Sequence, residues 1–239
     1  MKKLILSLFT FISLAVFAQE NKVINDANAV TRSLNGSFTG IAVSSGVELY
    51  ITQGNEESIA VSASEQKHLD RLKTEVVNGI LKIYYDNKGV TWRSGGKAKL
   101  KAYVSFKTLE KFNISAGSEV KVNGTIQADK LKMDVSSGAD FTGAINAQEL
   151  TVEVSSGAAM KVTGSAGKFT VEANSGADFK GYDFATDFCD ASASSGAAIH
   201  VTINKELNAK ASSGGDIQYK GTALIRDIKT SSGGAVKKR

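Results

Sequence analysis

Apolar and polar residues alternate along the C-terminal two thirds of the chain, around a tripeptide of two small residues and a glycine. The residues one and three places before the tripeptide are almost always apolar, and so is the residue three places after its glycine. The residues between these positions are polar. The tripeptides of this array end at Gly117, Gly138, Gly157, Gly176, Gly196, Gly214 and Gly233. Because successive side chains of a strand point to opposite faces, each repeat is predicted to hold two half-buried strands joined at a glycine corner.

The spacing of the tripeptides indicates how the repeats assemble. Their glycines lie 18 to 21 residues apart, and a unit of that length cannot bury its apolar face alone. Stacking of like positions predicts an all-β fold, a right-handed parallel β-helix (β-solenoid) with coils of about 19 residues over residues 111–236. An antiparallel meander or sandwich also has short alternating strands, but it does not require one motif at a fixed spacing.

Glycine is expected to make both reversals of each coil. A corner that repeats in register needs a positive φ at one place, and glycine adopts this conformation without steric cost. A second turn is expected in most repeats, at Gly124, Gly143, Gly164, Gly181 or Gly221.

Residues 35–110 are predicted to form a β-rich N-terminal part. An earlier tripeptide that ends at Gly46 has the same apolar pattern around it and indicates a first coil, 71 residues ahead of the array. Residues 65–72 favour one or two helical turns. Asn78 and Gly79 lie between two apolar runs, which is the strongest short signal for a β-hairpin.

The first 19 residues have the form of a secretory signal peptide. Lys2 and Lys3 precede an apolar run over residues 4–17, and cleavage is expected after Ala18 or Gln19. The run is shorter than the roughly 20 residues that span a bilayer, so we expect no membrane span in the mature chain. The protein is therefore predicted to be exported, to the periplasm, the outer surface or the medium, with residues 20–34 as a linker.

Composition excludes several classes of protein. With 42% hydrophobic and 22% charged residues, the chain has enough apolar surface to fold. Without the two leader lysines, 27 basic residues face 24 acidic ones, and a net charge of +3 is too small to indicate a nucleic-acid partner. The single cysteine, Cys189, cannot form an internal disulfide. Its alignment with Leu131, Leu150 and Phe169 predicts a buried core position rather than a nucleophile.

One outward column of the predicted solenoid carries carboxylates on alternate coils. It lies four positions after the first residue of each tripeptide and contains Glu119, Asp140, Ala159, Asp178, Ala198 and Asp216. In a polysaccharide-degrading enzyme, two of these acids would act as acid and base. Coils stack about 4.8 Å apart, so acids two coils apart are separated by roughly 9.6 Å. That distance exceeds a retaining pair and reaches the upper limit of an inverting pair. Since acids on alternate coils also avoid like-charge contacts, we interpret the column as a solvated binding face.

Trp92 lies in a glycine-rich loop and is the strongest candidate for recognition. An indole can stack on a sugar or anchor a protein partner, and it can equally cover an end of the solenoid. His68 and His200 have no metal-ligand spacing and are expected at the surface. The sequence contains no calcium-binding nonapeptide and no phosphate loop, so we expect no cofactor and no metal.

Together these features resemble the bacterial family described as putative auto-transporter adhesin, head GIN domain, which is common among secreted proteins of Bacteroidetes. The resemblance covers roughly residues 35–235. Its motifs are Phe38-x-x-Ile41-x-Val43 followed by Ser-Ser-Gly, Asn78-Gly79-Ile80-Leu81, and the repeated Ser-Ser-Gly-Ala-Asp units. The resemblance implies a right-handed parallel β-helix and carries over no catalytic residues. The chain departs from its relatives in having no proline near residues 105–109, where they often have one.

The sequence supports two functional hypotheses. We prefer a non-enzymatic secreted protein of the cell envelope or surface, an adhesin-like binding module or a structural module, whose partner is a cell-surface glycan or an envelope protein. Trp92, Asp140, Asp178 and Asp216 would carry the binding. The alternative is a polysaccharide-degrading β-helix enzyme. The uncovered last coil also leaves pairing with another copy, and hence a homo-oligomer, open.

Overall fold

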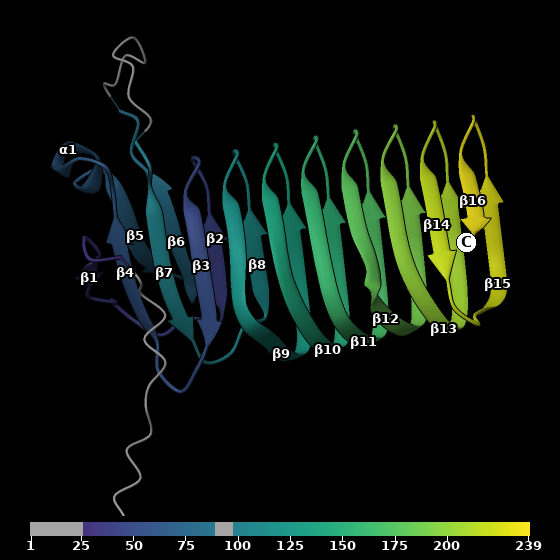
Figure 1. The fold of residues 1–239 in the computed structure, drawn as a ribbon, viewed down its shortest axis with the longest axis horizontal. Helices are drawn as coiled ribbons and strands as arrows, with labels where there is room; N and C mark the ends of the chain where they lie inside the picture. Colours follow the sequence, from purple (N-terminus) through teal and green to yellow (C-terminus); the bar gives the residue numbers. More distant parts are fainter. Residues whose placement is uncertain (1–25, 89–97) are drawn as a thin grey trace, which may run out of the picture.

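The computed structural model of the protein describes residues 26–88 and 98–239. Its strands stack side by side into an elongated solenoid, with helix α1 near one end and the C-terminus at the other (Figure 1). The leader predicted at residues 1–19 and the candidate Trp92 lie outside the described residues. No helix in the described part of the chain is long and apolar enough to cross a bilayer.

The strands are short in the N-terminal part and long in the array. The N-terminal part contains β1 (Val30–Arg32), β2 (Gly40–Val43), β3 (Glu48–Gln53), β4 (Ser58–Ser62), α1 (Gln66–Leu69), β5 (Leu72–Val77), β6 (Ile80–Tyr85) and β7 (Lys101–Phe106). The array contains β8 (Lys111–Ile114), β9 (Glu119–Val135), β10 (Asp140–Val154), β11 (Ala159–Ala173), β12 (Asp178–Ala193), β13 (Ala198–Ala211), β14 (Asp216–Lys220), β15 (Leu224–Thr230) and β16 (Ala235–Lys238).

The array is a parallel β-solenoid, as predicted. β9, β10, β11, β12 and β13 follow one another in the sheet, and each pairs in parallel with the next. The register joins like positions of successive repeats, since Phe141 pairs with Val120 on one side and with Met160 on the other. β14 and β15 extend the stack by pairing in parallel with β13, and β16 pairs with β14. This register excludes an antiparallel meander for the array.

Each tripeptide forms a tight turn. The N–H of Ala139 donates to the carbonyl oxygen of Ser136 at 3.2 Å. The two residues between them have positive φ angles, 55° at Ser137 and 68° at Gly138. Two consecutive positive φ angles define a type I′ turn. The expectation of one positive φ per corner is therefore wrong, because a two-residue reversal of this hand requires both central residues to adopt the left-handed conformation.

The second reversal of the coils formed by β9 to β13 is a bend inside a continuous strand. β9 runs for 17 residues past Gly124, and β10 runs for 15 residues past Gly143. A shift of register between Thr142 and Ala144 marks the bend in the β9–β10 pair. At these positions the separate turn expected from the sequence is replaced by a bend within a paired strand, whereas at Gly221 the chain leaves the strand between β14 and β15, as expected.

Inward side chains form stacked columns that fill the solenoid. Leu131, Leu150, Phe169 and Cys189 pair in register on successive coils, and each is at most 3% exposed. The ring of Phe169 also contacts that of Phe184, with centroids 5.1 Å apart. The predicted core position of Cys189 is thus confirmed, and each coil buries its apolar face against its neighbours.

The early tripeptide lies directly beside the array, although 71 residues separate Gly46 from Gly117. β2 pairs in parallel with β8, and β3 pairs in parallel with β9. The N–H of Gly46 donates to the carbonyl oxygen of Ala116 at 2.9 Å. The first coil predicted at Gly46 is therefore confirmed, and the residues between it and the array extend the sheets beyond it on the N-terminal side.

Those residues contain the predicted hairpin and helical turn. β5 and β6 pair antiparallel on either side of Asn78 and Gly79, whose φ angles are 52° and 72°. α1 lies within residues 65–72, as expected. β4 pairs antiparallel with both β7 and β1, and β1 lies within the segment 20–34 that the sequence assigned to a linker. Antiparallel strands thus occupy the N-terminal end of the parallel stack.

Candidate functional site

The outward side chains of the solenoid form two faces. The post-turn face is made by the strands that follow each tripeptide, namely β3, the first halves of β9 to β13, β14 and β16, with β7 and β4 beside β3. The pre-turn face is made by the strands that precede each tripeptide, namely β6, β2, β8, the second halves of β9 to β13, and β15. Figure 1 shows both sets of strands along the length of the solenoid.

The carboxylates predicted for one column lie together on the post-turn face. Asp140, Asp178 and Asp216 follow one another in register, separated by Ala159 and Ala198. Asp140 is exposed, whereas Asp178 and Asp216 are half-buried. Acids and alanines alternate from Asp140 to Asp216, whereas Glu119 and Asp140 lie on adjacent coils, and the role of the three acids in binding stays a prediction.

The neighbouring outward column supplies partners to these acids. Lys180 Nζ lies 3.0 Å from the carboxylate of Asp178, and His200 Nδ1 lies 3.7 Å from its other oxygen. Gln218 Nε2 donates to Asp216. The Oδ1 atom of Asp178 is buried and accepts no hydrogen bond within the described residues. Asp178 and Asp216 thus contact side chains of their own face.

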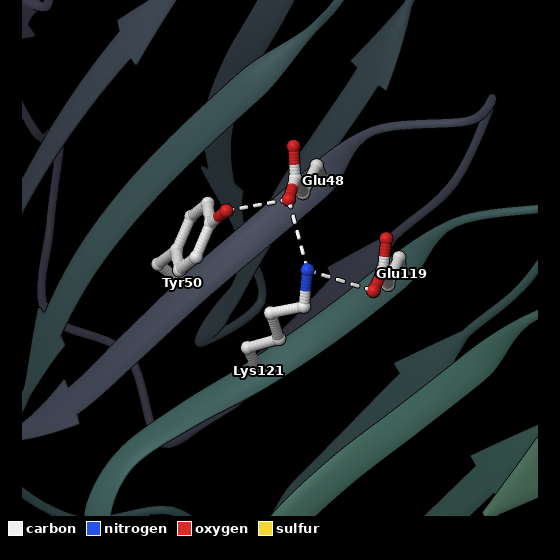
Figure 2. A network of polar contacts seen from close by, with 4 residues as sticks. All are labelled: Glu48, Tyr50, Glu119 and Lys121. Carbon is white, nitrogen blue, oxygen red and sulfur yellow. Dashed lines mark hydrogen bonds and ion pairs between the residues drawn. The ribbon is translucent and has the colours of Figure 1, made fainter. Parts of the chain in front are cut away.

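Four side chains form a polar network at the N-terminal end of the post-turn face (Figure 2). Lys121 Nζ lies 2.8 Å from Glu119 and 3.1 Å from Glu48, and the Tyr50 hydroxyl donates to Glu48. Tyr50 pairs with Lys121, and Glu48 pairs with Glu119, across β3 and β9. The network therefore connects the early coil to the array.

The network holds its groups in their usual charge states. Burial alone would raise the pKa of Glu48, but hydrogen bonds from Tyr50 and Lys121 lower it below its ordinary value. Hydrogen bonds to Glu119 and Glu48 raise the pKa of Lys121. The hydrogen bond to Glu48, together with burial, raises the pKa of Tyr50. All three shifts lead away from neutral pH.

An aromatic pair lies beside this network. The rings of Tyr50 on β3 and Tyr103 on β7 stack with centroids 5.3 Å apart and an angle of 12° between their planes. Tyr103 donates to Asp26 at 3.0 Å, and Asp26 also accepts from Ser62 at 2.6 Å. Burial, assisted by the bond to Asp26, raises the pKa of Tyr103 to about 12. The sequence analysis missed this cluster because β3 and β7 lie outside the repeat that aligns the later coils.

A second aromatic cluster lies at the C-terminal end of the same face. The centroids of the Tyr182 and His200 rings lie 5.0 Å apart, and Lys220 Nζ lies 4.4 Å from the centroid of the Tyr182 ring. The Tyr182 hydroxyl donates to Gln218 at 3.0 Å. Tyr182 falls within a shift of register between β12 and β13, so the repeat pattern did not reveal it. These contacts join side chains of neighbouring coils.

The pre-turn face carries acids on three adjacent coils. Asp134, Glu153 and Glu172 pair in register, and the same column becomes basic at Lys210 and Lys229. Burial, followed by the charge of Glu153, raises the pKa of Asp134. Like charges on neighbouring strands are unfavourable, and the post-turn face has the same feature where Glu48, Glu119 and Asp140 pair in register.

His68, His200 and Cys189, which the sequence did not assign to a site, are all at least half-buried. Within residues 26–88 and 98–239, no three His, Cys, Asp or Glu side chains are placed to hold a metal ion. Burial raises the pKa of the Cys189 thiol, so it stays protonated at neutral pH. His68 and His200 are half-buried, so each side chain keeps part of its surface in solvent. His68 Nδ1 lies 2.8 Å from the hydroxyl of Tyr85, and this contact explains its partial burial.

Several solved structures share this fold. A putative adhesin from Bacteroides fragilis matches with a TM-score of 0.78 and 17% identity, over 90% of this chain and 98% of its own. A putative adhesin from Parabacteroides merdae has a TM-score of 0.69 and 16% identity, over 90% and 97% of the two chains. A putative lipid binding protein from Parabacteroides distasonis has a TM-score of 0.63 and 16% identity, over 90% and 98%. At such identities the likeness concerns the fold alone.

The sequence also matches a protein-family model. The model described as putative auto-transporter adhesin, head GIN domain, matches residues 37–223. This match contains the early coil, the hairpin and most of the array, which are the segments that carried the resemblance. No curated protein sequence matches the chain.

Proposed function

Since the chain belongs to the family of putative auto-transporter adhesins with a head GIN domain, we propose that it is an exported, non-enzymatic protein of the cell envelope. It binds its partner through an outward face of the solenoid. The observation that carries this proposal is the register of β9 to β13, which places like side chains in straight columns. Such faces offer repeated groups at a constant spacing to an extended partner.

The electrostatics of the described residues support binding over catalysis. The Asp178 carboxylate lies beside Lys180, the Glu48 carboxylate lies beside Lys121, and the thiol of Cys189 is buried. A hydrolase needs a group whose pKa is tuned toward the working pH and aimed at the scissile bond. Hydrogen bonds from Tyr50 and Lys121 instead lower the pKa of Glu48, and the Cys189 thiol is removed from solvent.

The first residues to test are those that the sequence singled out. Asp140, Asp178 and Asp216 form one column on the post-turn face, and Trp92 is an aromatic anchor candidate outside the described residues. Their expected partner is a cell-surface glycan or an envelope protein. A glycan would contact the carboxylates through its hydroxyl groups, which donate strong hydrogen bonds to ionised oxygens.

Export is tested by fractionating cells that produce the full chain. We expect the protein in the periplasm, on the outer surface or in the medium, and we expect removal of residues 1–19 to retain it in the cytoplasm. Accumulation of the intact chain in the cytoplasm would contradict the proposal.

Binding is tested by sedimenting the full chain with washed cell envelopes. Asp140→Asn, Asp178→Asn and Asp216→Asn are combined in one variant, and Trp92→Ala is measured separately. A matched control, Asp134→Asn with Glu149→Gln and Glu153→Gln, removes the same charge from the pre-turn face. A selective loss of binding in the first variant or in Trp92→Ala identifies the residues that bind. Absence of any retention by envelopes would overturn the proposed function.

The same preparation tests the enzymatic alternative. The full chain is incubated with neutral and acidic polysaccharides, and new reducing ends are measured. We expect none above the background. Release that is abolished by Asp140→Asn would replace the proposed function with polysaccharide cleavage.

A further inference from the structure

One residue of the pre-turn face breaks the pattern of its column. Phe188 on β12 is 44% exposed, and it is the one exposed aromatic side chain among the described residues. On the coils before and after it, the column holds Lys168 and Glu206. Lys205 Nζ lies 5.6 Å from the centroid of the Phe188 ring, and the ring itself stays partly open to solvent.

Two adjoining hollows lie beside this ring. One, of about 300 Å³, is lined by Phe188, Asp190 and Asn208 among others. The other, of about 230 Å³, continues from the same Asp190 and Asn208 to Ser192 and Lys210. Together they form a shallow groove across β11, β12, β13 and β15, which we call the Phe188 groove. Pockets that enclose a whole ligand have volumes of about 300 Å³ or more, and neither hollow is larger than that.

The groove presents hydrogen-bonding groups next to the ring. Asn208 Nδ2 donates to Asp190 Oδ1 at 2.7 Å, which fixes both side chains in place. This bond leaves the second carboxylate oxygen of Asp190 and the amide oxygen of Asn208 as further acceptors, and Ser192 adds a hydroxyl. The groove therefore combines one apolar ring with fixed acceptors and a donor on an open surface.

The charges that line the groove are nearly balanced. Three lysines and four carboxylates line the two hollows. Lys229 lies 2.7 Å from Asp227, and Arg226 pairs with Glu206. A strongly charged polymer would meet repulsion as often as attraction here. The groove is therefore suited to an uncharged ligand.

We propose that the Phe188 groove binds a neutral carbohydrate chain, with one sugar ring on Phe188 and hydroxyl groups of the next sugar on Asp190 and Asn208. A pyranose has an apolar C–H face and a rim of hydroxyls, which matches an exposed ring beside fixed polar acceptors. A protein partner would require an interface core depleted of charge, whereas charged residues surround Phe188. The inference rests on the proposed function, because it names the ligand of that surface binding, and it places the ligand on the pre-turn face.

The test uses a glycan array that carries neutral gluco-, manno-, galacto- and N-acetylglucosamine oligosaccharides together with uronic acid oligomers. We expect the full chain to bind one or more neutral classes. Phe188→Ala should weaken this binding about tenfold or more, as loss of a central aromatic contact does. Asn208→Ala should weaken it as well. Because Phe188 is exposed, its replacement should leave the urea midpoint of unfolding unchanged.

The matched control is Leu224→Ala. Leu224 follows Glu206 in the same outward column and is 56% exposed, but it does not line either hollow. Its replacement should leave binding unchanged. Raising the salt concentration from about 0.05 to about 0.5 M should change the affinity for the neutral glycan by less than about twofold, because no net charge is neutralised.

Three results would overturn the inference and leave the proposed function intact. These are equal glycan binding by wild type and Phe188→Ala, binding confined to uronic acid oligomers, and retention by envelopes through protease-sensitive material alone. Absence of binding both to the array and to envelopes would overturn the proposed function as well.

Discussion

The backbone N–H of Gly138 donates to the carbonyl oxygen of Ser156 on the next coil, with 3.0 Å between nitrogen and oxygen. The equivalent bond recurs at each stacked tripeptide, from Gly46 with Ala116 to Gly214 with Ser232. The tight turns of the array thus have one backbone hydrogen bond within the turn and another to the turn of the next coil. This arrangement leaves few backbone groups unsatisfied where the chain reverses.

We predict different costs for alanine at the two kinds of bend. A Cβ on Gly138 would meet no atom within 4 Å, so Gly138→Ala should cost only the left-handed strain, about 1 kcal/mol. A Cβ on Gly164, where φ is 107°, would overlap the carbonyl oxygen of Ile145. Gly164→Ala should therefore cost about 3 kcal/mol or more. Urea denaturation measures both, and equal losses would contradict the geometry of the second bend.

Asp134→Asn should stabilise the protein at neutral pH. Burial and the neighbouring Glu153 raise the pKa of Asp134, so its ionised form is disfavoured in the folded state. The penalty is full above the folded pKa and disappears as the pH falls below the unfolded value. The difference in free energy of unfolding between variant and wild type should thus be positive at pH 7 and vanish near pH 3. Asp140→Asn, at an exposed position, serves as the control.

Lys121→Met should destabilise the protein at neutral pH. The pKa of Glu48 is lowered by Tyr50 and Lys121 despite its partial burial, so this carboxylate stabilises the folded state above its unfolded pKa. That contribution is lost as the pH falls through the folded pKa. The lysine is partly exposed, so the loss in Lys121→Met at pH 7 should be about 1 kcal/mol or less. Urea unfolding at pH 7 and pH 3 would show the difference shrink; a difference that grows in acid would exclude this account of the network.

The thiol of Cys189 should react only when the array opens. Its side chain is 3% exposed, and burial raises its pKa, so little thiolate is present and reagents cannot reach it. An aromatic disulfide reagent should label the native protein no faster than the amides of β12 exchange with solvent. Denatured protein is the positive control. Rapid stoichiometric labelling of the native chain would place Cys189 at the surface.

Backbone amides of β15 should exchange with solvent before those of β11. All residues of β15 are exposed, and it pairs on one side with β13, whereas β11 is paired on both sides. In a stack of repeats, the outer unit has one stabilising interface where an inner unit has two. Hydrogen exchange read by mass spectrometry resolves the two strands. Equal protection of β15 at high protein concentration, lost on dilution, would instead indicate pairing of β15 with another copy.

The repeat in the sequence determined most of the array. Since one column position recurs every 18 to 21 residues, adding one repeat length to Leu131 leads to Leu150, then to Phe169 and Cys189. The pairing register of successive coils follows from this repeat length alone. The hairpin at Asn78 and Gly79 was equally local, because a type I′ turn needs only its two central residues.

The tertiary structure decided what the repeat cannot specify. The Tyr50–Tyr103 stack depends on β7 lying between β3 and β4, an order that sequence neighbours do not give. Phe188 lies next to a shift of register between β12 and β13. Its in-register neighbours Lys168 and Glu206 are charged, so the repeat assigns Phe188 to an outward column but does not predict an aromatic ring there. The sequence therefore determined which residues stack in columns and which side chains are buried, because burial recurs with the length of the repeat. The contents of each outward face were set by bulges and by pairing between distant strands, which are properties of the packed solenoid as a whole.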